Sequence, residues 1–257
     1  RFESQFGVRC REAWLPDVFG YPASLPQIFR AGGCDRFITQ KSSWNKSTRF
    51  PHSTFEWQGL DGSKVLTHLP PADTNNATVG APVPVWNGEL YFETHRGTLT
   101  SQARTKVGNR LCERLLREAE LWWASVATAT AAMPTEVADE LEELWKQVLV
   151  QQFHDILPGS SITWVHDDAE ATHTRVAARL EELIAQALAQ LAPSVPAIAN
   201  ASAHARHEVV GSGETAFIAS VPGFGIAPLT THEIDDHVAV TEHSFTNKSI
   251  AVSWDLD

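Results

Sequence analysis

The chain has 257 residues, of which 43% are hydrophobic, and a formal net charge of −11 at pH 7. This length suits one large domain or two to three small ones, and the hydrophobic content is ordinary for a globular protein with a sizeable core. The acidic balance excludes nucleic acid and anionic membrane as expected partners, because neither phosphate groups nor lipid headgroups attract an acidic surface.

The three cysteines are widely spaced and odd in number. A disulfide framework or a Cys-x-x-Cys metal site is therefore not expected, and we predict a reducing compartment, the cytoplasm. The sequence contains no signal peptide and no apolar run long enough to cross a membrane, although Arg1 is not an initiator residue. A homo-oligomer is compatible with these features.

Residues 1–85 alternate short strands, loops and one or two helices, which predicts part of an α/β domain. Asp17 follows an apolar run, so we expect it at the carboxyl end of a strand, where parallel α/β sheets place their chemistry. An alternative is that Asp17 caps the helix that begins near Ser24. Farther on, Lys41 lies in a polar cluster after a second predicted strand, and Asp73 lies just beyond a third.

Two further stretches precede the helical part of the chain. Residues 50–63 predict two strands joined by a turn at Asp61 and Gly62. Strand alternation at 93–96 would point Glu93 and His95 the same way. Such a pair can bind a metal, but a buried ion pair is the commoner arrangement.

Helical periodicity predicts helices at about 100–128, 135–156 and 166–191, which would form a three-helix bundle with short connections. His154 and Asp155 lie near the end of the second helix, where Pro158 and Gly159 stop it. We therefore expect His154 in the last helical turn. A core histidine bonded to a backbone carbonyl is the alternative, since one His-Asp pair lacks the ligands that a metal needs.

Two runs of residues resemble the α-mannosidases of glycoside hydrolase family 38, closest to their bacterial and cytosolic type. The first is Trp-Leu-Pro-Asp-Val-Phe-Gly-Tyr at 14–21, and the second is Gln-Phe-His-Asp-Ile-Leu-Pro-Gly-Ser-Ser at 152–161. The resemblance implies an incomplete α/β catalytic domain followed by a three-helix bundle and the start of a β-sandwich region. The corresponding ranges are 1–85, 86–192 and 193–257.

The resemblance also implies site roles. Asp17 is expected as nucleophile and zinc ligand, and His154 as a second zinc ligand, with the other Zn²⁺ ligands upstream of residue 1. The expected substrate-binding residues are Phe19, Lys41, Asp73 and Asp155. A zinc ion held in this way would serve as a template and Lewis acid for the sugar.

The expected function is that of a retaining, zinc-dependent exo-α-mannosidase that hydrolyses terminal α-mannosides of oligosaccharides. One alternative is a non-catalytic carbohydrate-binding or scaffold protein of the same fold. Another is a metal-dependent hydrolase that uses water activated by His-Asp ligands, which would form no covalent intermediate on Asp17.

The sequence departs from the family in two places. Between Asn76 and Trp86 the family normally has more α/β domain, including the loop with the usual general acid, and no such loop exists here. Losing part of a domain would expose core and leave strands unpaired, so we expect that residues are missing at the 79–82 junction. A second discontinuity is expected near Val210 and Gly211.

Overall fold

A computed structural model of the chain describes residues 2–70, 82–192, 197–212, 215–228 and 238–255. The chain splits into two compact units, and each is discontinuous in sequence. Unit 1 consists of Arg1–Asn109 and Leu149–Ala171, and unit 2 consists of Arg110–Val148 and Thr172–Asp257. Three long helices each contribute residues to both units: α3 (Ala103–Thr130), α4 (Thr135–Gln151) and α5 (Thr163–Leu191).

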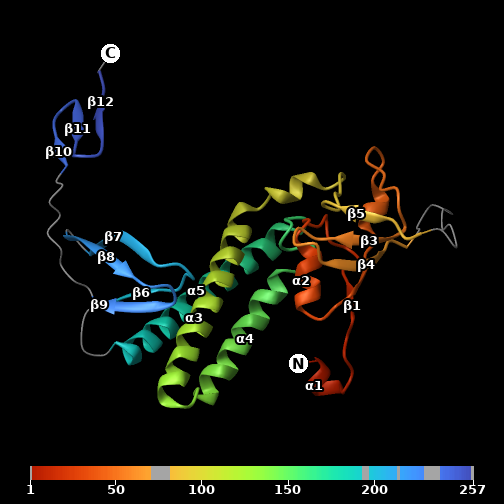
Figure 1. Cartoon of the computed structure of the whole chain (residues 1–257), viewed down its shortest axis with the longest axis horizontal. Helices are drawn as coiled ribbons and strands as arrows, with labels where there is room; N and C mark the ends of the chain where they lie inside the picture. The colour runs from red at the N-terminus through yellow and green to blue at the C-terminus, as the bar shows by residue number, and fades with distance from the viewer. Residues whose placement is uncertain (1, 71–81, 193–196, 213–214, 229–237, 256–257) are drawn as a thin grey trace. The chain divides into compact units, whose positions relative to one another are not determined.

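Unit 1 contains a five-stranded sheet with the order β1-β2-β4-β3-β5 (Figure 1). Its strands are β1 (Glu12–Trp14), β2 (Arg36–Ile38), β3 (Thr54–Gln58), β4 (Lys64–His68) and β5 (Val85–Asn87). The first three strands in this order run parallel, whereas β3 is antiparallel to β4 and parallel to β5. The predicted turn joins β3 to β4, and Gly62 adopts a φ of +84° there.

Aromatic side chains dominate the core of unit 1. Phe55 and Trp57 alternate with more exposed residues along β3, as expected for a strand with one buried face. The buried cluster contains Tyr21, Phe37, Phe55, Trp57, Val65, Leu69 and Leu90. Helix α2 (Leu25–Ala31) contacts β4, and the remaining short helices of the unit are α1 (Phe2–Phe6), η1 (Lys41–Trp44) and η2 (Arg96–Leu99).

The three helices appear where periodicity predicts them, but α4 ends at Gln151 and not at 156. The amide groups of Gln152 and Phe153 bind the carbonyls of Leu149 and Val150, three residues back. Hydrogen bonds of this spacing tighten the last turn and end an α-helix. His154 therefore lies in a turn after the helix, which corrects its predicted place in the last helical turn.

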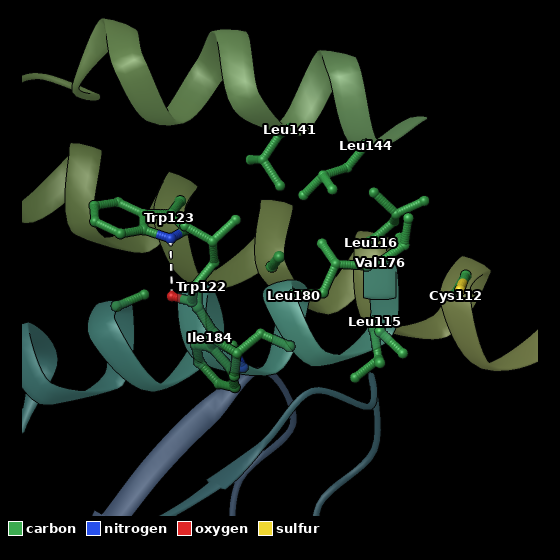
Figure 2. Close-up of a cluster of buried hydrophobic side chains, with 14 of the residues drawn as sticks. Cys112, Leu115, Leu116, Trp122, Trp123, Leu141, Leu144, Val176, Leu180 and Ile184 are labelled. Atoms are coloured by element: carbon green, nitrogen blue, oxygen red, sulfur yellow. Dashed lines mark hydrogen bonds between the residues drawn. The ribbon is translucent and has the colours of Figure 1, made fainter. Parts of the chain in front are cut away.

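The apolar faces of the helices meet in the core of unit 2 (Figure 2). Trp122 and Trp123 are almost fully buried, and the Trp123 indole Nε1 donates a hydrogen bond to the Leu183 carbonyl at 3.0 Å. The cluster also contains Cys112, Leu115, Leu116, Leu141, Leu144, Val176, Leu180 and Ile184. Large side chains from all three helices thus bury each other's surface, which is what the periodic pattern requires.

Strands follow the helices, as predicted for the last part of the chain. They form small sheets: β6 (Ala197–Asn200) with β9 (Gly225–Pro228), β7 (Arg206–Ser212) with β8 (Thr215–Val221), and β10 (Ala239–Val240) with β11 (Ser244–Thr246) and β12 (Ala251–Ser253). A β-sandwich remains a prediction, as do the domain ranges 1–85, 86–192 and 193–257.

The two expected discontinuities stay predictions. Val210 and Gly211 lie in β7, which pairs with β8 in one register. This pairing does not test whether the family has further residues at that point. The 79–82 junction lies outside the described residues, except for Pro82.

Candidate active site

The ends of two parallel strands bring Asp17 and Lys41 together. Asp17 follows β1, and Lys41 begins η1 shortly after β2. Because parallel strands end at the same edge of a sheet, residues that follow them come close in space. The Lys41 Nζ lies 3.4 Å from Asp17 Oδ1, so a positive charge stands beside the carboxylate.

Aromatic rings surround the Lys41 ammonium group. Its Nζ lies 3.9 Å from the centroid of the Trp44 ring and 5.5 Å from that of Phe19, and only 12% of the side chain is exposed. Cations are attracted to aromatic faces at such distances, and the attraction grows when water is excluded. Lys41 is thus held in place beside Asp17, whereas an isolated lysine in a sequence usually predicts a solvated charge.

The turn after α4 brings His154 to the same carboxylate. His154 Nε2 lies 4.0 Å from Asp17 Oδ2 and 3.6 Å from Asp155 Oδ2. Both distances exceed those of a hydrogen bond. Ser160 Oγ donates to Asp155 Oδ1 at 3.2 Å, and half of the Asp155 side chain is exposed.

The distance between Asp17 and His154 can be compared with that between two ligands of one zinc ion. Zinc bonds of about 2.0–2.2 Å at a tetrahedral ion place two ligand atoms roughly 3.3–3.6 Å apart, and the 4.0 Å between His154 Nε2 and Asp17 Oδ2 is slightly longer. Zinc usually takes four ligands. Among the described residues, no group of three or more His, Cys, Asp or Glu side chains could hold a metal ion.

A pocket of about 520 Å³ opens beside these groups. Asp17, His154 and Lys106 supply charged or ionisable groups to its lining, and most of the rest is apolar, including Leu15 and Leu99. Ligand pockets typically combine an apolar wall with a few polar groups that orient the ligand. A second cavity of about 560 Å³ is lined by the loop that follows Lys41, but none of the predicted site residues that the structure describes lines it.

Phe19 also lines the pocket, and two aromatic residues support it. Its ring stacks on His95 with centroids 4.7 Å apart and an interplanar angle of 6°, and on Phe92 at 5.9 Å. His95 Nδ1 is buried and has no hydrogen-bond partner among the described residues. The sequence does not reveal these contacts, because nothing in the residue pattern links position 19 to positions 92 and 95.

Glu93 and His95 are not a strand pair, which corrects that expectation. No strand forms at 93–96, and the Glu93 carboxylate accepts hydrogen bonds from the backbone amides of Lys46, Ser47 and Thr48. These hydrogen bonds lower the pKa of Glu93 to about 2. Glu93 therefore anchors the loop after η1.

This pKa predicts the effect of Glu93→Gln on acid stability. The folded pKa of about 2 lies below the ordinary value of 4.5, so the ionised carboxylate stabilises the fold above pH 4.5 and loses this effect as the pH falls towards 2. The variant should melt at a lower temperature than the wild type at pH 7, and the difference should shrink between pH 4.5 and 2. Circular dichroism melts across this range measure it. Glu89→Gln, an exposed change in the same segment, is the control; equal effects of both variants would contradict the prediction.

Lys106 is a pocket residue that the sequence does not reveal. Its Nζ donates hydrogen bonds to the carbonyls of Ser101 at 2.5 Å and Leu157 at 3.0 Å. Burial lowers the pKa of Lys106. A lysine within a helical pattern predicts only a solvated charge. Asp73, which we expect at the substrate, lies outside the described residues.

Family models match two segments of the chain. Residues 1–81 match the N-terminal domain of the glycosyl hydrolases of family 38, and residues 93–191 match the alpha mannosidase middle domain. The two matched segments include Asp17 and His154, respectively. The chain belongs to glycoside hydrolase family 38. The resemblance found in the two sequence runs is thereby confirmed.

Curated relatives of this family 38 chain are alpha-mannosidases. Alpha-mannosidase G of Dictyostelium discoideum is 37% identical over an alignment of 256 positions. The alignment covers 73% of this chain and 23% of the relative. Alpha-mannosidase 2C1 of Homo sapiens is 33% identical over an alignment of 307 positions. The alignment covers 89% of this chain and 29% of the relative. This family 38 chain thus spans less than a third of the length of these relatives.

Each alignment is longer than the number of residues that this chain supplies to it. The first has 256 positions but includes only 73% of this 257-residue chain, and the second has 307 positions but includes only 89%. Both relatives therefore have segments without a counterpart in this chain. A solved alpha-mannosidase from Enterococcus faecalis V583 superposes with a TM-score of 0.67 at 17% identity and covers 81% of this chain and 34% of its own. At this identity the likeness shows the fold alone. None of the helices within the described ranges combines the length and hydropathy needed to span a membrane.

Proposed function

We propose that this chain acts as the catalytic part of a retaining, zinc-dependent exo-α-mannosidase. The observation that carries the proposal is the convergence of Lys41 and His154 on the Asp17 carboxylate at the edge of the sheet. The alpha-mannosidase names of the relatives support the choice of sugar. The proposed substrate is a mannose-containing oligosaccharide, and the proposed location is the cytoplasm.

In this proposal, Asp17 attacks the anomeric carbon of the mannose residue while the glycosidic bond breaks and the leaving oxygen takes a proton from a general acid, for which no described residue is assigned. Water then hydrolyses the covalent bond between the sugar and Asp17. Lys41 places its positive charge on the other side of that carboxylate and, with Trp44 and Phe19 around it, keeps Asp17 oriented towards the pocket. Phe19 offers its ring to the apolar face of the sugar. Asp155 is proposed to bind a sugar hydroxyl, since its side chain stays half exposed next to His154.

Zinc would be held by Asp17 and His154, and when bound it supplies a Lewis acid that orients adjacent sugar hydroxyls. The remaining ligands would have to come from outside the described residues, because no third donor completes the group there. With these two ligands alone, zinc would be bound weakly. Asp73 remains a proposed substrate-binding residue.

The same incompleteness favours a second candidate, a carbohydrate-binding protein without turnover. One experiment separates the two. The chain is incubated with 4-nitrophenyl α-D-mannopyranoside, with and without added Zn²⁺, and the anomer first released is identified by proton NMR. Zinc-stimulated release of α-mannose supports the proposal, and release of β-mannose contradicts the retaining mechanism. Binding of mannose oligosaccharides in calorimetry, with no hydrolysis under any metal condition, supports the binding protein.

A further inference from the structure

The turn at 152–159 determines where His154 lies. The two carboxylates next to His154 Nε2 are both beyond hydrogen-bond distance, at 3.6 and 4.0 Å. They therefore do not hold the imidazole in one place by hydrogen bonding. The Phe153 ring contacts the imidazole with centroids 4.2 Å apart, and Phe153 belongs to the same turn. The residues that fix the turn therefore also fix the imidazole.

The first part of α3 and the residues just before it bind this turn near both of its ends. Near the start of the turn, Gln152 Nε2 donates to Asn109 Oδ1 at 3.0 Å. Near the end, Lys106 Nζ donates to the Leu157 carbonyl at 3.0 Å, and Ser101 Oγ donates to the Pro158 carbonyl at 2.7 Å. Lys106 and Asn109 are three residues apart and thus share one face of the helix.

Close packing at Gly159 shows how tightly the end of the turn is held. Gly159 has a φ of +88°, and a Cβ atom built there would lie 2.5 Å from Ser101 Oγ. The positive φ alone strains any other residue at this position, and Ser101 Oγ would also have to move. The end of the turn therefore packs closely against the residues just before α3.

Lys106 supplies a positively charged donor to this arrangement, and its ammonium group donates hydrogen bonds to backbone carbonyl groups. Nζ bonds the carbonyls of Ser101 and Leu157 at the same time, and within the described ranges no carboxylate forms an ion pair with it. A partly buried ammonium group without an opposite charge is unfavourable unless its hydrogen bonds are used. A neutral side chain in its place would leave the Leu157 carbonyl without this donor.

We propose that Lys106 is a positioning residue that fixes the turn at 152–159 so that His154 faces Asp17. For its catalytic consequence this inference rests on the proposed function, but the positioning itself can be measured without turnover. Lys106 acts through the Leu157 carbonyl, three residues after His154. It is not assigned a bond to the sugar.

The test compares Lys106→Met with the wild type, Lys106→Arg and the control Lys146→Met. Lys146 is an exposed lysine of α4 that pairs with Glu142 and Glu143. Hydrogen exchange by mass spectrometry reports on the peptide that contains residues 152–159. The affinity for Co²⁺, measured by visible absorption, reports on the Asp17 and His154 pair, and kcat and KM are measured with 4-nitrophenyl α-mannoside.

Lys106→Met should speed exchange in the 152–159 peptide by roughly tenfold, because the turn opens more often. It should also weaken Co²⁺ binding about 10- to 100-fold, as for other residues that orient metal ligands, and lower kcat more than it raises KM. Lys106→Arg should keep most of the wild-type protection from exchange, Co²⁺ affinity and kcat. Lys146→Met should behave like the wild type in all three measurements.

Unchanged exchange and Co²⁺ affinity in Lys106→Met would overturn the inference, and so would a rise in KM alone, which would mean direct contact with substrate. If Lys106→Met does not fold, Lys106→Gln takes its place and should speed exchange in the same peptide. If the wild type has no mannosidase activity but the exchange and Co²⁺ effects appear, the proposed function fails and the positioning role stands.

Discussion

Asp17→Asn should lower kcat/KM for 4-nitrophenyl α-mannoside by roughly 10⁴-fold or more, as for other residues that bond covalently to the substrate. Asparagine has nearly the same shape but cannot attack the anomeric carbon as a carboxylate does. The change also removes the ion-pair partner of Lys41 at 3.4 Å and one of the two proposed zinc ligands. Initial rates at saturating and limiting substrate give kcat and kcat/KM separately.

The matched control is Asp139→Asn, the same chemical change at an exposed position of α4, and it should leave activity unchanged. A loss of activity in Asp17→Asn alone does not separate the nucleophile from a metal ligand. A 5-fluoro-mannosyl fluoride does so, because it should trap the glycosyl group on the peptide that contains Asp17. A label on any other residue, or more than a tenth of wild-type activity in Asp17→Asn, would contradict the assignment.

Trp123→Ala should have the largest effect on stability among the changes considered. The side chain is 3% exposed in the helical core of unit 2, and its indole donates a hydrogen bond to the Leu183 carbonyl (Figure 2). Removing a buried tryptophan leaves a cavity and costs about 3–5 kcal/mol, which corresponds to a fall in melting temperature of roughly 10 °C for a chain of this size. Thermal unfolding followed by circular dichroism measures the shift.

Trp164→Ala makes the same substitution in α5 at a side chain that is 76% exposed. Surface changes of this kind usually alter stability by less than about 0.5 kcal/mol. The two melting temperatures should therefore differ clearly. If both variants melt together with the wild type, the helical core does not support the fold in the way that its burial indicates.

Local patterns predicted the helices and the place of Asp17 after a strand. Apolar spacing of three and four residues marked α3, α4 and α5, and the apolar run before Asp17 marked β1. The end of α4 was predicted too late, because the sequence signals Pro158 and Gly159 lie beyond the place where the last turn tightens at Gln152 and Phe153. A stop signal shows where a helix can no longer continue, but the hydrogen bonds decide where it ends.

The site itself was only partly predictable. Asp17 and His154 stood out through their motifs, whereas Lys106 and the rings behind Phe19 had no signal in the residue pattern. Their roles arise from contacts between segments far apart in the chain, such as Lys106 with Leu157 and Phe19 with His95. The same limitation explains Glu93, whose carboxylate was weighed as a metal ligand and in fact holds the backbone of a distant loop.

The discontinuity of unit 1 has a consequence for how the site forms during folding. Asp17 belongs to the first segment of the unit and His154 to the second, and residues 110–148 lie between them in the chain. Bringing the two segments together closes a long loop, which is slow when the intervening chain is unstructured. Pairing of α3 with α4 is a local event that shortens this loop. We therefore expect variants that loosen this helical hairpin to delay recovery of activity on refolding, even when their final activity is normal.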